Sequence, residues 1–305
     1  MKKRVTVLIF LLVFPFLFSA PVKEEQPVTE SQFTVVDSRN LTISLKQKPQ
    51  KIVSLSPNIT EILFELGLGE RVVGRTDYCD YPQEALKIVS VGDLLSPSVE
   101  KIVSLGTDLV IISNLGQKAT VEALENAQIK VAYFNESATM DGTFDLINKV
   151  ATLTGTTERA DQIIREMQAT LKEVEQHLSD SYRPTLYYVA GFGEWGDYTA
   201  TGDTYINDII NLSGASNIAA DATGWSYQRE MLVAKDPDII LLPSFMSSTF
   251  EQTKKEFENQ LPYSALTAVK NGKIITIENN LIERQSHRSA LAVKELAAKI
   301  KMITE

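Results

Sequence analysis

Apolar residues follow two alternating patterns along this chain: short continuous runs, and longer stretches in which they recur every three or four positions. Short runs rich in Val, Ile and Tyr are typical of buried strands, and the longer spacing is typical of helices. Strands that alternate with helices form parallel sheets with crossover helices, so each half of the chain predicts a small α/β lobe. The runs are KIVSL (51–55), RVVG (71–74), DLVIIS (108–113), KVAYF (130–134), TLYYVA (185–190), DIILLP (238–243) and KIITI (273–277).

One amphipathic stretch between the two halves is unusually long. From Thr157 to Asp180 apolar residues return every three or four positions, while Glu, Arg, Lys and Gln fill the other face. A helix of this length spans roughly 36 Å, about the length of a small lobe. Gly155 before the stretch and Pro184 after it are typical of helix ends. The stretch is either one more surface helix or a rigid rod between two lobes, and both flanks favour the rod.

The expected fold is therefore α/β, with two Rossmann-like lobes, each with a central parallel sheet, joined by one long bridging helix. The first lobe is predicted over residues 33–142, the bridging helical segment over 143–182, and the second lobe over 183–305.

The first 32 residues do not continue this pattern. Three basic residues (2–4) precede the apolar run VTVLIFLLVFPFLFSA, which has the layout of a secretory signal. Phe18 stands where a cleavage site prefers a small residue, so residues 1–20 are either a cleaved signal peptide or a retained N-terminal anchor. Residues 21–32 are polar, contain proline and predict a linker. We expect an exported, extracytoplasmic protein.

Composition and charge narrow the classes of function. Apolar residues make up 44% and charged residues 23%, close to the soluble globular average. Loss of residues 1–20 would remove three positive charges and change the net charge from −9 to −12. A body this acidic is repelled by phosphate backbones, so we expect no nucleic-acid partner. Cys79, the only cysteine, has no partner for an internal disulfide, and with two histidines in the chain no zinc-type cluster is predicted.

One segment occurs twice. SVEKIVSLGTDLVII (98–112) is matched by QREMLVAKDPDIILL (228–242), and the paired acids are Glu100 with Glu230 and Asp108 with Asp238. Each copy predicts a helix start, a turn, an Asp and a buried strand, with Ser98 and Ser226 as the nearest capping residues. An acid in the first helical turn is favoured by the helix dipole, so helix support is one interpretation of the glutamates. Because they recur in both lobes, the other interpretation is a pair of exposed carboxylates that meets two basic sites on a partner.

A glycine-rich segment raises a rival class. GFGEWG (191–196) follows a predicted strand and fits G-x-G-x-x-G, the pattern of dinucleotide-binding turns. Glu194 would lie beside the pyrophosphate, Trp195 would crowd it, and the next residues predict an extended loop instead of a helix. We expect a loop at the edge of a ligand cleft, with Phe192 or Trp195 near the ligand.

Other enzyme motifs are missing from the sequence. It contains no G-x-S-x-G and no H-E-x-x-H, and Asp77 and Asp80 have no accompanying base. We expect no enzymatic activity; an exported α/β enzyme is the alternative from another class. Asn58 lies at the start of a helix opened by Ser56 and Pro57, where backbone N–H groups attract polar ligand groups. Simple helix capping is its competing interpretation.

The stretch KIVSLSPNITEILFELGLGERVVGRTDYCDYPQEALKI (51–88), followed by VEKIVSLGTDLVII, resembles the extracytoplasmic cobalamin- and siderophore-binding proteins of ABC importers, closest to the cobalamin branch. The resemblance covers nearly the whole chain from Lys51. It rests on Leu55-Ser56-Pro57, Tyr78 through Pro82, Glu100, Asp236-Pro237-Asp238 and the ERQSHR segment from Glu283. It implies two lobes bridged by one helix, a ligand held between them, and docking of one glutamate per lobe on arginines of the permease. Glu100 and Glu230 occupy those positions.

The resemblance also implies three ligand contacts. Tyr78 matches an aromatic that lies against the corrin ring, Trp225 lies close to a ligand-facing tryptophan, and Arg284 matches a Glu-Arg pair near the cleft, where a guanidinium binds carboxylate or phosphate. The competing interpretations are a half-exposed loop residue for Tyr78, ordinary packing for Trp225 and an ion pair with a nearby acid for Arg284. No role is carried onto His287, which stands where relatives often have proline.

Two positions depart from the cobalamin branch, because Leu94 and Leu281 stand where it has tryptophans. We expect a corrinoid ligand, with haem or a ferric siderophore as alternatives of the same transport class. No intrinsic cofactor or protein metal site is expected, since the metal arrives inside the ligand. The implied partner is the permease dimer of an ABC importer with its ATPase subunits, and we expect the binding protein to be a monomer.

Overall fold

The computed structural model describes residues 33–113, 117–178, 182–193, 196–243 and 249–305. The predicted signal, the predicted linker and Trp195 lie outside these ranges. Among the described helices none is both long and apolar enough to cross a membrane.

The first lobe contains a four-stranded parallel sheet in the order β4-β3-β5-β6. Leu109 of the inner strand β5 lies opposite Ile52 on one side and Lys130 on the other. An antiparallel hairpin that the sequence did not predict precedes the sheet. The elements are β1 (Phe33–Val36), β2 (Thr42–Leu45), β3 (Ile52–Ser54), α1 (Pro57–Glu65), η1 (Gly69–Arg71), β4 (Val72–Arg75), η2 (Gln83–Lys87), α2 (Val99–Ser104), β5 (Leu109–Ser113), α3 (Lys118–Asn126) and β6 (Lys130–Phe134).

The second lobe repeats this plan with the order β10-β9-β7-β8, again all parallel. In both sheets the first strand lies between the second and the third, and the fourth pairs with the third. The elements are β7 (Thr185–Tyr188), α6 (Tyr205–Leu212), β8 (Ser216–Asn217), α7 (Arg229–Lys235), β9 (Ile239–Leu241), α8 (Phe250–Asn259), η4 (Tyr263–Ala265), α9 (Thr267–Lys270), β10 (Ile274–Ile275), α10 (Asn279–Glu283) and α11 (Ser289–Thr304). The prediction of two α/β lobes with parallel sheets is confirmed.

The repeated aspartates have the same structural role in both lobes. Asp108 Oδ2 accepts hydrogen bonds from the backbone N–H groups of Gln50 (2.8 Å) and Lys51 (2.9 Å), just before β3. Asp238 Oδ2 accepts from the backbone N–H (2.8 Å) and the hydroxyl (2.7 Å) of Thr185, the first residue of β7. In each sheet the aspartate before the third strand thus ties down the start of the first strand. This role explains why the two segments share an Asp at that point.

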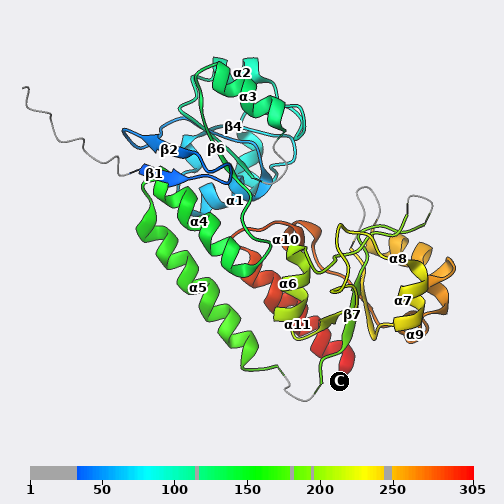
Figure 1. Cartoon of the computed structure of the whole chain (residues 1–305). Helices are drawn as coiled ribbons and strands as arrows, with labels where there is room; N and C mark the ends of the chain where they lie inside the picture. Colours follow the sequence, from blue (N-terminus) through cyan, green and yellow to red (C-terminus); the bar gives the residue numbers. More distant parts are fainter. Residues whose placement is uncertain (1–32, 114–116, 179–181, 194–195, 244–248) are drawn as a thin grey trace, which may run out of the picture. The chain divides into compact units, whose positions relative to one another are not determined.

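Between the two lobes the sequence forms two helices, α4 (Met140–Thr154) and α5 (Thr157–Glu175). They pack side by side (Figure 1). Gly155 ends α4 with a left-handed φ of 70°, which a side chain would disfavour. The predicted long helix begins at Thr157 as expected but ends at Glu175, short of Asp180, which lies outside the described residues. α5 packs on both α4 and α11, so the bridge is a layer of helices instead of a lone rod.

The two faces of each sheet belong to different apolar cores. One continuous core contains inner-face residues of both sheets, such as Ile52 and Leu186, together with Met167 of α5. The outer face of the first sheet is covered by α2 and α3, and that of the second by α7 and α8. Ile102 of α2 and Leu232 of α7 are the corresponding buried anchors, 0% and 1% exposed.

Candidate ligand-binding and docking sites

The topology places four predicted ligand residues after equivalent strands. Asn58 follows β3 and Phe192 follows β7, the first strands of the two sheets, while Tyr78 follows β4 and Trp225 follows β8, the second strands. In parallel sheets the carboxyl ends share one edge, and ligands bind there, where the strand order reverses. The sequence-based choice therefore falls on the expected edge of both lobes.

Asn58 is buried and does not cap its helix, since the N-cap of α1 is Ser56. Its amide donates to Ser113 Oγ (3.1 Å) at the end of β5 and to the backbone carbonyl of Gln285 (3.3 Å). Ser56 Oγ also bonds the backbone of Ser113, so the carboxyl ends of β3 and β5 are fixed to each other. Asn58 thus joins the first lobe to the ERQSHR segment, Glu283–Arg288.

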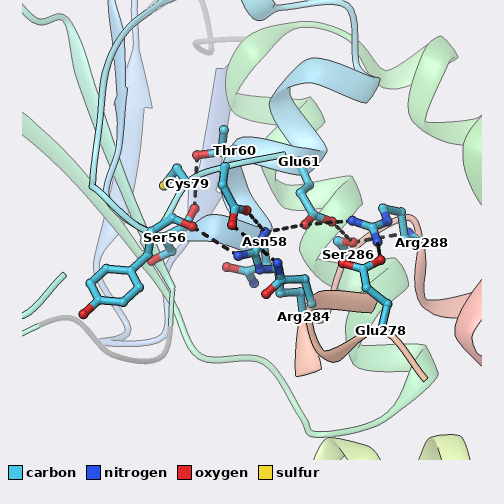
Figure 2. A network of polar contacts seen from close by, with 12 residues as sticks. Ser56, Asn58, Thr60, Glu61, Cys79, Glu278, Arg284, Ser286 and Arg288 are labelled. Carbon is cyan, nitrogen blue, oxygen red and sulfur yellow. Dashed lines mark hydrogen bonds and ion pairs between the residues drawn. The ribbon is translucent and has the colours of Figure 1, made fainter. Parts of the chain in front are cut away.

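The same segment supplies an ion network around Glu61, whose side chain is fully buried (Figure 2). Arg284 Nη1 lies 3.0 Å from Glu61 Oε1 and 2.7 Å from Asp80 Oδ1, and Arg284 Nη2 donates to the carbonyl of Tyr78 (3.1 Å). The guanidinium of Arg284 is therefore engaged with protein groups, as in the ion-pair interpretation. Arg284 therefore holds the loop that carries Tyr78 against the ERQSHR segment of the second lobe.

Arg288 and Ser286 complete the network from the other side. Ser286 Oγ donates to Glu61 Oε2 at 2.6 Å, and Arg288 Nη1 lies 3.5 Å from Oε1. Arg288 also pairs with Glu278 at 2.6 Å and lies over the ring of Tyr81, 3.9 Å from its centroid. Burial raises the pKa of Glu61, while the hydrogen bonds from Ser286 and Arg284 and the nearby guanidinium groups act in the opposite direction.

Sequence reasoning missed Glu61, although a signal existed. Glu61 stands among Ile59, Ile62 and Leu63 on the buried side of α1, where an apolar residue is expected. A buried carboxylate requires a charged or hydrogen-bonding partner. The two arginines of ERQSHR were the available cations, so the pairing follows from burial once the fold is known.

Tyr78 and Trp225 both present aromatic rings to solvent, 53% and 42% exposed. Trp225 has a φ of 64°, a conformation that bulky residues rarely adopt. Its backbone is held there because its N–H donates to Thr201 Oγ1 (3.1 Å) and its carbonyl accepts from Thr199 (3.0 Å). Strained residues that the fold holds in place are typical of functional sites.

Phe192 is placed differently from these two residues. Its ring packs edge-on against Phe257 and Tyr263, with centroids 5.1 Å and 5.7 Å apart, so it contributes to the outer core of the second lobe. Gly191 forms a β-bridge with Tyr198, and the next described helix, α6, begins only at Tyr205. In the described residues from Gly196 onward no helix opens before Tyr205, whereas a dinucleotide-binding turn opens a helix directly.

The two repeated glutamates are the second residues of α2 and α7, and both are exposed. Ser98 caps α2 as predicted, because its hydroxyl accepts from the N–H of Lys101 (3.2 Å). The prediction for Ser226 is wrong: the N-cap of α7 is Gln228, without a side-chain cap. The chain at Ser226 is instead bridged to Tyr198 in extended conformation.

Three further residues complete the comparison with the sequence. Leu281 is 7% exposed and belongs to the shared core, so it is not a cleft surface in place of a tryptophan. His287 lies 3.6 Å from Glu65, and no cluster of three metal-ligating side chains occurs in the described ranges. Cys79 is buried beside the hydroxyl of Thr76, consistent with a structural residue.

Comparison with known proteins assigns the chain to a family. The family model described as periplasmic binding protein matches residues 52–281. The chain belongs to the periplasmic binding protein family. An uncharacterized ABC transporter substrate-binding lipoprotein of Bacillus subtilis (strain 168), YvrC, is 31% identical to it over 91% of this chain and 88% of that protein.

Two further proteins are similar to this chain, one in sequence and one in fold. A cobalamin-binding protein of Halobacterium salinarum (strain ATCC 29341 / DSM 671 / R1) is 30% identical over 86% of this chain and 71% of its own length. The periplasmic heme-binding protein HutB of Vibrio cholerae has the same fold, with a TM-score of 0.74 at 21% identity over 82% of this chain and 98% of that one. This chain is thus an extracytoplasmic substrate-binding protein of the ABC-transporter type, a class that works with a membrane permease and ATPase.

Proposed function

We propose that this periplasmic binding protein captures a corrinoid and delivers it to the permease of an ABC importer. The observation that carries the proposal is the pair of exposed aromatic rings, Tyr78 and Trp225, which follow the equivalent second strands of the two lobes. Flat aromatic side chains suit a large conjugated ring because they bury apolar area against it. The cobalamin-binding relative supports the same ligand class.

In this proposal the metal enters as part of the ligand, and the protein contributes aromatic and polar walls. Asn58 and Arg284 are already bonded within the protein, so their role is to hold the walls in place while Tyr78 and Trp225 contact the ligand. Haem is the second candidate, favoured by the fold shared with HutB. A ferric siderophore is the third.

Titration of the purified protein with cyanocobalamin, haemin and a ferric hydroxamate tests the ligand, with tryptophan fluorescence as the signal. We expect saturable quenching by the corrinoid, and about tenfold or greater loss of affinity in Trp225→Ala, because one stacking surface is removed. Quenching by haem alone would assign the second candidate. No response to any of the three compounds would refute binding of this ligand class.

Docking is tested separately with charge reversal of the repeated acids. Glu100→Lys and Glu230→Lys should abolish uptake and leave ligand affinity nearly unchanged, because both carboxylates are exposed on the short helices α2 and α7 and neither belongs to the residues proposed to contact the ligand. Glu70→Lys and Glu256→Lys are matched controls, since both residues are exposed and lie on other elements. Loss of ligand affinity in the docking variants would assign these acids to the ligand site or the fold instead.

A further inference from the structure

The helices α2 and α7 correspond position by position. Their aligned residues are VEKIVS (99–104) and REMLVA (229–234), and only two of the aligned positions carry identical residues. These are the glutamates already described and the valines three residues later, Val103 and Val233. Both valines are exposed, by 46% and 43%.

Packing explains the residue type at the buried position of each helix, but not the residue types at the exposed positions. Ile102 and Leu232 anchor the helices in the outer cores, so packing dictates an apolar residue there. At the exposed positions the fold leaves the choice free, and the two copies diverge, with Lys101 against Met231. Valine is also a poor helix former in an exposed position.

A single exposed valine is ordinary on a protein surface. Here the same residue recurs in both lobes at the same offset from the same acid. Residues three apart on a helix lie on one face, so each carboxylate has an apolar neighbour one turn away. The repeat therefore consists of two equivalent surfaces, each formed by an acid and a valine.

We propose that these acid–valine pairs, Glu100 with Val103 and Glu230 with Val233, form a two-part docking surface for the permease. The partner that fits them presents a basic side chain next to an apolar one, and presents this combination twice. Charge complementarity selects and orients the partner, while burial of the valines slows its dissociation. The proposal rests on the proposed transport function and adds an apolar contact that charge alone does not supply.

Serine substitution of both valines tests the proposal. The probe is a permease–ATPase complex in lipid nanodiscs that binds the wild-type protein and does not bind the Glu100→Lys/Glu230→Lys variant. Each of Val103→Ser and Val233→Ser should weaken binding to this complex by about threefold to tenfold, because roughly half of a valine side chain is available for burial. The double variant should lose more than either single one.

Val36→Ser is the matched control, since this valine of β1 is 52% exposed and lies on neither helix. Val103→Ile and Val233→Ile should retain permease binding, which separates loss of the apolar contact from damage to the helix. Ligand affinity and thermal stability should stay close to wild type in all of these variants.

The outcomes separate the two proposals. Permease binding within twofold of wild type in the valine double variant would overturn the apolar contact and leave acid-dependent docking standing. If no permease–ATPase complex binds the wild-type protein in an acid-dependent way, the proposed transport function itself fails. A loss of binding in Val36→Ser equal to that in the valine variants would also overturn the inference.

Discussion

The ion network around Glu61 allows a worked prediction for Glu61→Gln. The glutamine side chain has the same shape but carries no charge, and one of its two terminal groups donates where the carboxylate accepts. In the wild type, Oε1 accepts from Arg284 and Arg288 and Oε2 accepts from Ser286, so both carboxylate oxygens face donors. The substitution therefore places a donor against donors and leaves two buried guanidinium groups without their shared anion.

The magnitude follows from what each arginine retains. Removal of one partner of a buried ion pair typically costs about 3–5 kcal/mol. Here Arg284 keeps Asp80 at 2.7 Å and Arg288 keeps Glu278 at 2.6 Å, and both of these acids are partly exposed. We therefore expect a loss of about 2–3 kcal/mol in the free energy of unfolding, which lowers Tm by about 3–5 °C in a chain of this size.

Urea unfolding followed by circular dichroism measures the free energy, and an unchanged slope would show that the compactness of the two states is unaffected. Glu70→Gln, an exposed residue of the same type in the same lobe, is the control and should change stability by less than about 0.5 kcal/mol. A double-mutant cycle with Arg284→Gln should give less than the sum of the two single costs. If Glu61→Gln were as neutral as Glu70→Gln, the reasoning that the network stabilises the fold would be refuted.

Two further predictions concern pH and the paired aspartates. Burial and nearby arginines lower the pKa of His287 to about 4 from 6.5, so the unfolded chain binds a proton first as the pH falls. As the pH falls from 6.5 to about 4, His287 should therefore lower the free energy of unfolding by up to about 3 kcal/mol. Urea unfolding should show that this loss is absent in His287→Gln and present in the exposed control His177→Gln. Asp108→Asn and Asp238→Asn should each cost about 1–2 kcal/mol at neutral pH, because each weakens two strand-tying hydrogen bonds. Burial alone would raise the pKa of Asp238, but the hydrogen bonds from Thr185 outweigh it and the pKa is lowered. The stability that the ionised Asp238 contributes is therefore present above pH 3.8 and is lost in acid. The stabilities of Asp238→Asn and wild type, plotted against pH, should converge in acid, and a constant difference would contradict this assignment.

Periodic patterns were sufficient to predict the framework of the fold. Every predicted strand exists, because each is a short, largely apolar and buried run in a parallel sheet. The repeat around Asp108 and Asp238 was visible in the amino-acid sequence. The hydrogen bonds of these aspartates to the starts of β3 and β7 explain it. The antiparallel hairpin Phe33–Leu45 was not predicted, because its alternation is short and its faces are only partly buried.

The candidate site was less predictable, since its geometry depends on contacts between residues far apart in the chain. Arg284 was chosen for its charge, yet what decides its surroundings is Glu61, more than two hundred residues earlier. Phe192 was chosen from its place beside a glycine turn, but its ring packs on Phe257. Tyr78 and Trp225 are exposed at strand ends as a ligand-contacting role requires, and their contact with ligand stays a prediction.

The apolar core shared by the inner faces of both sheets has a consequence for how the chain folds. A division of the gene between residues 142 and 143 would leave each half with a bare hydrophobic surface, because one continuous core joins the inner faces of both sheets to α4, α5 and α11. Neither half is then a self-sufficient folding unit, although each contains a complete sheet. The chain should melt in a single cooperative transition, and a break in the bridging segment should destabilise both lobes together.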